Sequence, residues 1–360
     1  MSGTSLDGID VALLRTDGEG LVERGRSRTF PYDEGQRELL RRALTAAIAV
    51  TDRRDRRGIL GEAEAALTHW HGEAVKSFCR AIDLSLAEVN IVGFHGQTMI
   101  HRPERRLTVQ LGDGQELADM LRVPVAYDLR AADVAAGGQG APLVPVYHRA
   151  LAENLPKPIA FINIGGVANV TWVGRSGELV AFDTGPGNAL IDDWMKAHTG
   201  KARDENGAMA RRGRVDEATV AQFLGDSFFE KPGPKSLDRN SFAGISLEGL
   251  PLADGAATLV AVTARSIAAS VVHMPEPPES WIVCGGGRHN AAIMDALTTW
   301  LPNVMPAEAC GLNGDSMEAE AWAYLAVRSL RELPLTFPGT TGVEEAITGG
   351  VIAPPRAPRI

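Results

Sequence analysis

Apolar and polar positions divide this chain into two kinds of segment. Short apolar runs, bounded by glycine or by polar residues, predict strands at 10–14, 89–94, 108–111, 124–127, 159–164, 167–173, 179–182 and 281–284. Between these runs, apolar residues recur at helical spacing, which predicts helices over about 34–50, 60–82, 114–121, 144–154, 188–198, 254–272, 289–301 and 315–330. Strands that alternate with helices in this way are typical of an α/β protein.

The two halves of the pattern begin alike, each with a strand, a tight turn and a second strand. Asp17-Gly18 supplies the positive φ of a hairpin turn in the first half, and 159–182 repeats the arrangement in the second. Two such halves predict a mixed sheet duplicated across a cleft, with the glycines of 137–140 at the boundary. We therefore expect one lobe at 1–131, joined by a C-terminal tail at about 345–360, and a second lobe at 132–344.

Composition and charge narrow the class of function. The formal net charge of −9 argues against a nucleic-acid surface, and the arginines of 53–57 and 211–214 stand beside Asp and Glu. The three cysteines are widely spaced, which is typical of a reducing compartment. No apolar run approaches the length of about 18 residues that a membrane span needs. We therefore expect a cytoplasmic protein that binds neither nucleic acid nor membrane.

Three glycine-bearing turns adjoin predicted strands, at 3–8, 182–188 and 284–290. Glycine lets backbone N–H groups approach an anion without interference from a Cβ atom, and successive N–H groups form a phosphate seat. The usual nucleotide motifs, G-x-x-x-x-G-K-[ST] and G-x-G-x-x-G, do not occur. The wide separation of the three turns predicts a nucleotide that is held by two lobes rather than by a single loop.

Six collinear segments carry a family resemblance: Met1–Asp10, Gly93–Thr98, Ala135–Pro145, Asn163–Asn169, Phe182–Asn188 and Cys284–Gly287. Together they closely resemble anhydro-N-acetylmuramic acid kinases over essentially the whole chain. This family belongs to the superfamily of sugar kinases, actin and heat-shock chaperone ATPases. The resemblance therefore implies two actin-like (ribonuclease H-like) lobes with mixed sheets around a central nucleotide cleft, with ATP and Mg²⁺ as cofactors. It also implies the conversion of 1,6-anhydro-N-acetylmuramic acid, ATP and water into N-acetylmuramic acid 6-phosphate and ADP in peptidoglycan (cell-wall) recycling, and we expect a homodimer.

This reaction requires a base. A 1,6-anhydro sugar has no free 6-hydroxyl, so its bridging oxygen accepts a phosphoryl group only as the C1–O6 bond opens and water attacks C1. Asp183, at a strand end that leads into a glycine turn, is the candidate base, and the family motif points to the same residue. The alternative is that Asp183 caps its own turn. Glu318 matches a family glutamate that helps to hold the attacking water, although a glutamate on a helix is usually solvated.

The nucleotide contacts follow from the same resemblance. Phosphate contacts are expected from Gly3, Thr4, Ser5, Leu6, Asp7, Gly8, Ile9, Asp10, Gly165, Gly166, Asn169, Gly185 and Gly187. Adenosine contacts are expected from Gly285, Gly286, Gly287 and Asn290, although a strand-to-helix turn alone would also favour glycine. Either Asp7 or Asp10 could hold magnesium through water, since Mg²⁺ keeps most of its hydration shell.

The sugar contacts are also carried over by position. The resemblance implies Gln97, Thr98, Arg130, Gly138 and Gln139 as substrate-binding residues. Arg130 could pair with the lactyl carboxylate in a bidentate fork, or it could tie the two domains together. His95 follows a buried strand, and we expect it to be a hydrogen-bonded structural residue.

The chain departs from the family pattern in two places. Relatives carry several apolar residues before the segment Met1-Ser2-Gly3, so we expect the strand that supports the phosphate turn to be short. The loop Lys235–Asn240 differs from the usual Lys-Ser-Thr-Gly-Arg-Glu pattern, which leaves the roles of Lys235 and Arg239 open.

Two other functions compete with the anhydro-sugar kinase. One is an ordinary sugar kinase, in which Asp183 would deprotonate a free sugar hydroxyl rather than water. The other is an ATP-driven conformational module of the same superfamily, which would need none of Asp183, Gln97 and Arg130.

Overall fold

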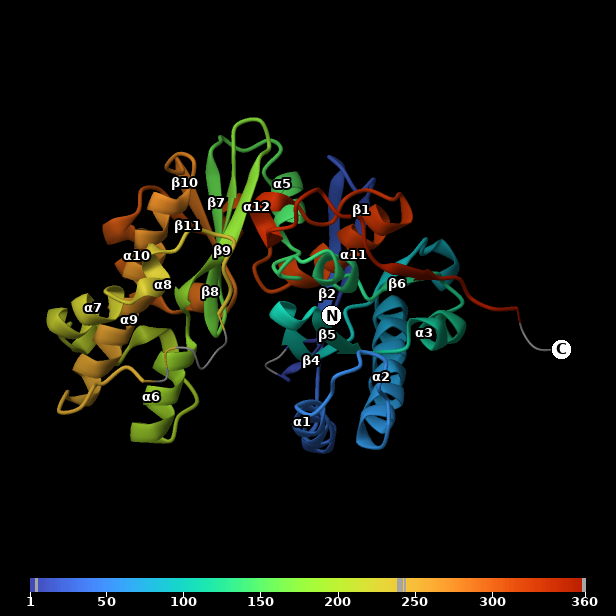
Figure 1. The fold of residues 1–360 in the computed structure, drawn as a ribbon, viewed down its shortest axis with the longest axis horizontal. Coiled ribbons are helices and arrows are strands. Elements are labelled where there is room, and N and C mark those ends of the chain that lie inside the picture. The colour runs from blue at the N-terminus through green and yellow to red at the C-terminus, as the bar shows by residue number, and fades with distance from the viewer. Residues whose placement is uncertain (4–5, 238–241, 243, 358–360) are drawn as a thin grey trace. The chain divides into compact units, whose positions relative to one another are not determined.

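The chain folds into two compact units. The computed structural model describes residues 1–3, 6–237, 242 and 244–357. Unit 1 comprises Met1–Ala150 with Glu318–Ile360, and unit 2 comprises Leu151–Met317. Strands and helices alternate in both units, and parallel and antiparallel pairing occur together, so each is a mixed α/β unit as predicted (Figure 1).

The unit boundaries differ from the predicted lobes of 1–131 and 132–344. Two buried hydrogen bonds give the reason. Tyr147 Oη donates to the Glu320 carboxylate at 2.7 Å, and Thr341 Oγ1 donates to the Asp133 carboxylate at 2.6 Å. These bonds tie 132–150 to 318–344, and Arg328 of the second segment donates to the Gly18 carbonyl within 1–131. Both segments therefore belong to unit 1, and the glycines of 137–140 form a turn inside this unit.

Unit 1 contains short sheets with helices around them. Its strands are β1 (Gly8–Thr16), β2 (Val22–Pro31), β3 (Val92–Gly93), β4 (Gln97–Arg102), β5 (Leu107–Leu111), β6 (Val125–Tyr127) and β12 (Val351–Ala353). Its helices are α1 (Glu34–Ala47), α2 (Ile59–Ala81), α3 (Gly114–Leu121), α4 (Ala131–Ala135), α5 (Pro145–Leu151), α11 (Met317–Leu330) and α12 (Pro338–Thr341), α5 and α11 each crossing a unit boundary by one residue. Strands β1 and β2 pair, β4 and β5 pair, and the third sheet has the order β12-β6-β3.

The predicted hairpin at the head of unit 1 is confirmed. The Asp17 carboxylate accepts hydrogen bonds from the N–H groups of Glu19 and Leu21, and Gly18 has a φ of +76°. The side chain of Arg328 on α11 donates to the Gly18 carbonyl at 2.6 Å, so the hairpin turn is attached to this helix.

Residues 1–3 lie beside β1. Met1 and Asp10 exchange two backbone hydrogen bonds of 2.8 Å on the edge of β1 that faces away from β2. Beside this pair, an apolar cavity of about 450 Å³ extends between β1 and the segment Glu88–Phe94. Residues 1–3 therefore form one rung beside β1 rather than a strand.

Unit 2 is organised around one five-stranded sheet. Its strands are β7 (Ile159–Ile164), β8 (Val167–Val173), β9 (Leu179–Pro186), β10 (Ser280–Cys284) and β11 (Val304–Pro306), in the order β11-β10-β7-β8-β9. The helices are α6 (Ala189–Thr199), α7 (Glu217–Leu224), α8 (Ser227–Glu230), α9 (Leu252–Ala269) and α10 (Ala291–Trp300). Strands β7, β8 and β9 form an antiparallel meander, and β10 pairs parallel to β7 and β11.

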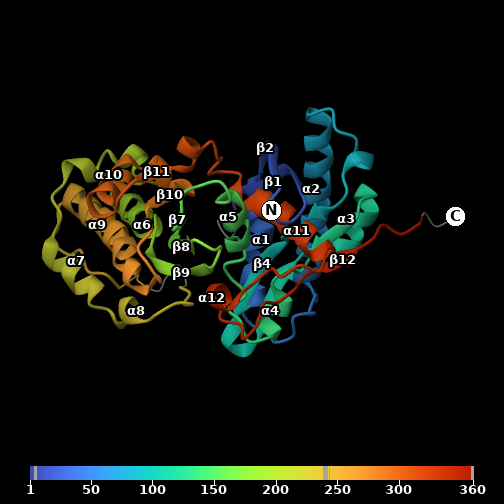
Figure 2. The ribbon, with the colours of Figure 1, turned by 90° about the horizontal axis from the view of Figure 1, so that it is seen from above.

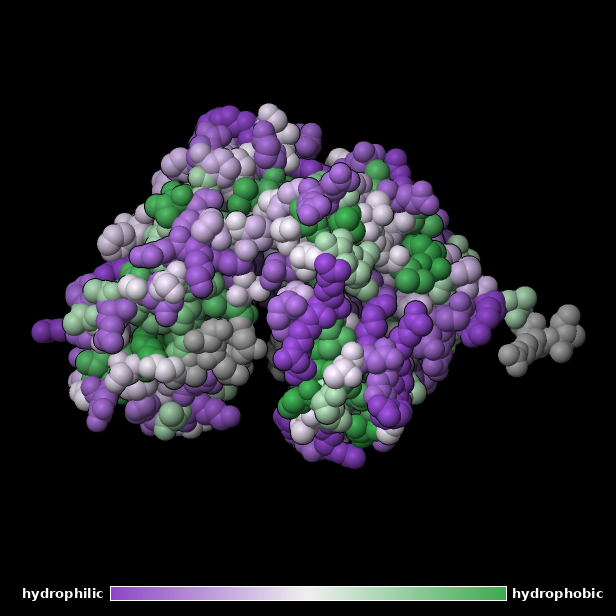
Figure 3. All heavy atoms as spheres, in the orientation of Figure 1, coloured by the Kyte–Doolittle hydropathy of each residue, from purple (hydrophilic) through white to green (hydrophobic). Residues whose placement is uncertain are grey.

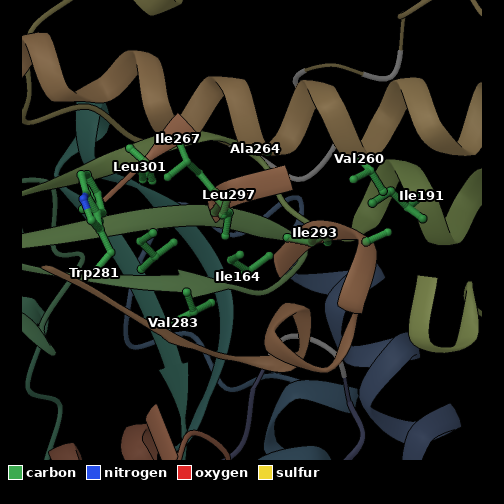
Figure 4. Close-up of a cluster of buried hydrophobic side chains, with 14 of the residues drawn as sticks. Ile164, Ile191, Val260, Ala264, Ile267, Trp281, Val283, Ile293, Leu297 and Leu301 are labelled. Carbon is green, nitrogen blue, oxygen red and sulfur yellow. The ribbon is translucent and has the colours of Figure 1, made fainter. Parts of the chain in front are cut away.

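The core of unit 2 lies between its sheet and α9 with α10 (Figures 1 and 2). Val260 and Ile267 of α9 belong to the same buried cluster as Ile164 of β7 and Val283 of β10 (Figure 4). The stretch Leu252–His273 is long and apolar enough to cross a membrane, but 72% of its most apolar 18-residue window is buried. Burial in this core accounts for its composition, and hydrophilic residues cover much of the visible surface of each unit (Figure 3).

The strands that sequence reasoning missed are short or polar. Strand β4 was predicted only as a ligand-binding segment after a strand, because Gln97, His101 and Arg102 interrupt its apolar pattern. Strands β11 and β12 each have three residues, too few to show a period. The antiparallel strands 159–164 and 167–173 are confirmed at the predicted bounds.

Candidate active site

Two glycine turns meet in unit 2, the predicted turn of 182–188 and the turn of 165–166. The N–H groups of Gly187 and Asn188 donate to the carbonyls of Gly166 and Gly165, at 2.9 and 2.7 Å. A Cβ atom on Gly187 would lie 2.2 Å from the Gly165 carbonyl oxygen, so only glycine permits this approach. The turn of 165–166 and the turn of 185–188 therefore form one continuous backbone surface.

The third turn lies against the end of β7. Gly285 has a φ of +73°, and a Cβ atom there would lie 2.3 Å from Asn163 Oδ1. A Cβ atom on Gly287 would lie 2.3 Å from Ile164 Cγ2. At Gly286, in contrast, the nearest described atom would be Asn188 Nδ2, at 3.9 Å. Folding thus requires glycine at 285 and 287, but not at 286.

A row of polar side chains crosses the sheet beside these turns. Asn163 of β7 pairs with Asn169 of β8, and Asn169 pairs with Asp183 of β9. Directly paired residues of an antiparallel sheet project from the same face, so the three side chains are neighbours. All three are half-buried among otherwise buried strand residues. The alternation of the strands contained this signal, but Asn163 was not predicted as a site residue.

Asp183 carries the perturbed charge of this row. Burial raises its pKa to about 7, against the opposing effect of the Leu237 N–H group, which donates to Oδ2 at 2.7 Å. Among the described residues, the carboxylate accepts no hydrogen bond from the N–H groups of 184–187. This arrangement does not support the alternative of a residue that caps its own turn. A carboxyl group with a pKa near neutrality is suited to general-base catalysis.

The same pKa makes stability depend on pH. The folded-state pKa of about 7 lies above the ordinary value for Asp, so the folded protein binds a proton that the unfolded chain has lost. The contribution of Asp183 to the free energy of unfolding is therefore fully present below about pH 4 and is lost as the pH rises toward 7. We therefore compare the free energy of unfolding of Asp183→Asn with that of the parent. The difference should favour the variant more at pH 8 than at pH 5. Urea unfolding of both proteins at the two pH values measures this difference, and an unchanged difference would contradict the raised pKa.

Thr263 and Ser266 of α9 contact the turn of 185–188, and sequence reasoning missed both. Thr263 Oγ1 donates to the Gly187 carbonyl at 3.0 Å. A Cβ atom on Gly185 would lie 2.7 Å from Ser266 Cβ. Their spacing of three residues on a mostly apolar helix was the available signal.

Arg288 fixes the third turn from the side, and it was also missed. Its Nη1 donates to the Gly285 carbonyl at 2.9 Å, and the guanidinium forms ion pairs with Glu308 and Asp315. Asn290, expected to contact adenosine, uses its Oδ1 to accept from the N–H groups of Ala292 and Ile293 at the start of α10. Its oxygen therefore serves as the N-cap of this helix.

The divergent loop holds Asp183 through its backbone. The Asp183 N–H group donates to the Lys235 carbonyl at 2.9 Å. Lys235 Nζ donates to the Phe228 and Lys231 carbonyls and lies 4.4 Å from the centre of the Phe228 ring, and burial lowers its pKa to about 8. Lys235 is thus engaged by Phe228 of α8 and by Lys231, whereas Arg239 lies outside the described residues.

The predicted phosphate turn of unit 1 is described in part, because Thr4 and Ser5 lie outside the described residues. The Leu6 N–H group donates to the Gly3 carbonyl at 3.3 Å, and the Tyr32 N–H group donates to the Asp7 carbonyl at 3.0 Å. A Cβ atom on Gly8 would lie 2.4 Å from the Phe30 carbonyl oxygen, so β2 requires glycine at this position.

The carboxylates of this turn suit a hydrated magnesium ion. Asp7 is exposed, and its side chain makes no hydrogen bond or ion pair with any described residue. Asp10 accepts a hydrogen bond from Thr29 Oγ1 at 2.6 Å. No group of three or more His, Cys, Asp and Glu side chains that could hold a metal occurs in the described part of the chain. One or two carboxylates suffice for an ion that keeps its water shell.

Gln97 faces the phosphate turn rather than open solvent. Its side chain is fully buried, and Nε2 donates to the Gly3 carbonyl at 3.0 Å. Its Oε1 has no partner among the described residues. Thr98, the next residue of β4, is half-buried and lies 3.4 Å from Gln110 Nε2.

The turn with Gly138 and Gln139 is held by buried residues that were not predicted as site residues. Asp133 Oδ1 accepts from the Gly140 N–H group at 2.6 Å. The Gln139 N–H group donates to the Thr341 carbonyl at 2.7 Å, and His101 Nε2 is 2.8 Å from the Gln139 carbonyl oxygen.

Arg130 is enclosed by unit 1. Its Nη1 donates to the Gly140 carbonyl at 2.8 Å, and its Nη2 lies 3.3 Å from His95 Nε2. The guanidinium carbon lies 5.3 Å from the centre of the Trp322 ring. Burial lowers the pKa of Arg130 to about 10, against the attraction of Glu318, an exposed residue in the first turn of α11. These partners of Arg130 all belong to its own unit.

Comparisons with known proteins identify the family of this chain. The family model "Anhydro-N-acetylmuramic acid kinase" matches residues 1–355. A relative of that name from Agrobacterium fabrum is 51% identical over 98% of this chain and 96% of its own, and one from Rhodopseudomonas palustris is 54% identical over 99% and 98%. A dehydratase activator from Clostridium difficile with bound ADPNP covers 53% of this chain and 67% of its own at 15% identity, with a TM-score of 0.36, which is too low to carry an argument. The chain belongs to the anhydro-N-acetylmuramic acid kinase family.

Proposed function

We propose that this protein is a phosphotransferase that opens 1,6-anhydro-N-acetylmuramic acid with water and transfers the γ-phosphoryl group of ATP to O6. The products are N-acetylmuramic acid 6-phosphate and ADP, within cell-wall recycling. Membership of the family supports the substrate class. The observation that carries the proposal is the Asp183 carboxyl group, with a pKa of about 7, next to the glycine turns that suit phosphate.

The reaction balances with one base and one leaving ether. Asp183 takes a proton from water as the water oxygen bonds to C1 of the sugar. The C1–O6 bond breaks, and O6 attacks the γ-phosphorus, so that the bond between the γ-phosphorus and the bridging oxygen of ADP breaks. Protonated Asp183 then returns its proton to solvent, which a pKa of about 7 makes easy at neutral pH. Glu318 would help to orient the water.

The glycine turns would hold the nucleotide. Backbone N–H groups of the turns at 3–8, 165–166 and 185–187 would bind the phosphates, and the turn of 285–287 would contact the adenosine. Asp7 or Asp10 would hold magnesium through water, and Asp7 has the freer carboxylate among the described residues. When bound, the ion would neutralise charge on the phosphate oxygens. Gln97, Thr98, Gly138 and Gln139 remain the residues proposed for the sugar. We also infer that the protein is a cytoplasmic homodimer. Analytical ultracentrifugation would measure the mass of the assembly.

Heavy-oxygen labelling tests the reaction. We expect the purified protein, incubated with ATP, magnesium and anhydromuramic acid in H₂¹⁸O, to place one solvent oxygen at C1, read by mass spectrometry of the sugar phosphate. Short incubations, with unlabelled product added to H₂¹⁸O as a control, exclude later exchange at C1. An unlabelled sugar phosphate with its 1,6-bridge intact would identify an ordinary sugar kinase. ATP hydrolysis without a sugar product would identify a conformational module.

Gly286 offers a test of the adenosine site that spares the fold. Because a Cβ atom at 286 meets no described atom closer than 3.9 Å, Gly286→Ala should leave the melting temperature unchanged. If the adenosine lies against this turn, the methyl group should raise the KM for ATP at least about fivefold, since close approach needs glycine. Gly20→Ala, at an exposed position where a Cβ atom meets nothing within 4 Å of the described chain, is the matched control. An unchanged KM for ATP would show that the adenosine does not lie against the turn of 285–287.

A further inference from the structure

Arg130 lies where three segments of the proposed site in unit 1 come together. Its Nη1 donates to the Gly140 carbonyl of the glycine turn, and its Nη2 reaches the buried His95 ring. The ring of Trp322, one helical turn after Glu318 on α11, lies against both His95 and Arg130, with centroid distances of 4.6 and 5.3 Å. One guanidinium therefore touches the glycine turn, the histidine beneath the phosphate turn and the helix that carries Glu318.

The hydrogen bonds define which nitrogen of His95 carries the proton. The arginine can only donate, so His95 Nε2 must accept from it. Nδ1 then carries the proton and donates to the Ser2 carbonyl at 2.7 Å. Burial and the neighbouring Arg130 hold the pKa of His95 well below its usual range, so the ring is neutral. Ser2 Oγ returns a hydrogen bond to the Gly96 carbonyl at 3.0 Å, and Gln97 Nε2 holds the Gly3 carbonyl.

Each terminal nitrogen of Arg130 thus makes one contact within unit 1. A bidentate pair with a sugar carboxylate needs two parallel N–H donors on one edge of the guanidinium. One terminal nitrogen already serves the Gly140 carbonyl and the other serves His95, and Nε is inaccessible to solvent without a partner among the described residues. Each terminal nitrogen keeps a second N–H group, so kinetics must decide between a positioning role and the lactyl-carboxylate role that the sequence suggested.

We propose that Arg130 is a positioning residue, which holds the Ser2–Gly3 backbone of the phosphate turn through His95 and holds the first turn of α11 through Trp322 and the charge of Glu318. It fixes His95 as the Nδ1–H tautomer, the form that can donate to Ser2. The placement of the phosphate turn and the orientation of Glu318 then depend on one cation. This inference rests on the proposed function for its kinetic consequences, but not for its structural ones.

Kinetics with two sugars distinguish positioning from substrate binding. The probes are 1,6-anhydro-N-acetylmuramic acid and 1,6-anhydro-N-acetylglucosamine, which lacks the lactyl carboxylate. We expect Arg130→Lys, which keeps the charge but loses the planar fork, to raise the KM for ATP at least about tenfold. The ratio of kcat/KM for the two sugars should stay within about twofold of the parent ratio. Loss of this preference, with the KM for ATP unchanged, would overturn the proposal and assign Arg130 to the lactyl carboxylate. Arg105→Lys, at an exposed position in the same unit, is the matched control.

A second pair of variants tests the path through His95. Asparagine can replace the Nδ1 donor to Ser2 but not the Nε2 acceptor, whereas alanine replaces neither. We therefore expect His95→Asn to retain a lower KM for ATP than His95→Ala. Adding Arg130→Lys to His95→Ala should raise the KM for ATP by no more than about twofold further, because both changes break the same path from Arg130 through His95 to Ser2. If the effects of the two changes on the KM for ATP were additive, Arg130 would not act through His95.

A spectroscopic readout is independent of the reaction. In ¹⁵N-histidine spectra, His95 should be neutral and protonated on Nδ1 in the parent protein. The bias toward that tautomer should weaken in Arg130→Gln. Direct titration of each variant with a fluorescent ATP analogue gives the affinity even if neither sugar reacts. If the proposed sugar chemistry failed, a shifted tautomer and a weakened ATP affinity would still support the positioning role, and an unchanged His95 spectrum in Arg130→Gln would refute it.

Discussion

Asp183→Asn should lower turnover with anhydromuramic acid by at least about a hundredfold and leave ATP affinity within about threefold of the parent. Asparagine keeps the size of the side chain and the acceptor for the Leu237 N–H group, which contacts the carboxylate at 2.7 Å. It removes the oxygen that can take a proton from water. The change therefore removes an interaction of the transition state and spares the glycine turns that we propose for the phosphates.

Single-turnover kinetics and nucleotide titration measure these two quantities. Asp193→Asn, an exposed change on α6, is the control for a lost carboxylate in the same unit. In the parent, turnover should rise with pH through about 7, as the folded Asp183 loses its proton. Comparable turnover in Asp183→Asn, or a pH profile that is flat from 6 to 8, would exclude Asp183 as the base.

Gly187→Ala should have the second largest effect. Its Cβ atom would lie 2.2 Å from the Gly165 carbonyl oxygen, a backbone atom that cannot rotate away. The turn of 165–166 and the turn of 185–188 would have to separate, and the hydrogen bonds from Gly187 and Asn188 would lengthen. We expect a loss of about 1–3 kcal/mol in the free energy of unfolding, as for other overpacked sites. We also expect a rise of at least about tenfold in the KM for ATP, because the proposed phosphate seat is deformed.

Chemical denaturation and ATP-dependent kinetics together test this prediction. Gly20→Ala, where the added methyl group meets nothing in the described chain, controls for the change of residue type. If the variant loses stability but binds ATP normally, Gly187 has a structural role and these turns are not part of the phosphate site.

Predictions from local pattern succeeded where the determining contacts are local. The strands 159–164 and 167–173 lie in a meander, where each strand follows its neighbour along the chain. The α3 helix, predicted over 114–121, begins at its N-cap Asp113, whose carboxylate accepts from the N–H groups of Gln115 and Glu116. The glycines at 185, 187, 285 and 287 are required by approaches of less than 3 Å that their turns create.

The partners of the site residues could not be predicted in this way. Arg130 was expected at a domain boundary or on the sugar. It contacts His95, which lies 35 residues earlier in the chain, and Trp322, which lies near the C-terminus. Glu318 was expected in the second lobe, whereas α11 packs with the first because Arg328 and Tyr324 donate to the hairpin at Gly18 and Glu19. Such pairings depend on which surfaces meet after the chain has collapsed.

By itself, the sequence determined the α/β class, the glycine turns and the family, because period, backbone freedom and motif order are properties of short segments. Its choice of Asp183 as the base stays a prediction. Tertiary structure alone decided that Asn163, Asn169 and Asp183 form one row and that burial raises the Asp183 pKa to about 7. It also decided that Arg130 serves His95 and Gly140. Burial and side-chain partners arise from segments far apart in the chain, so they exist only once those segments are packed together.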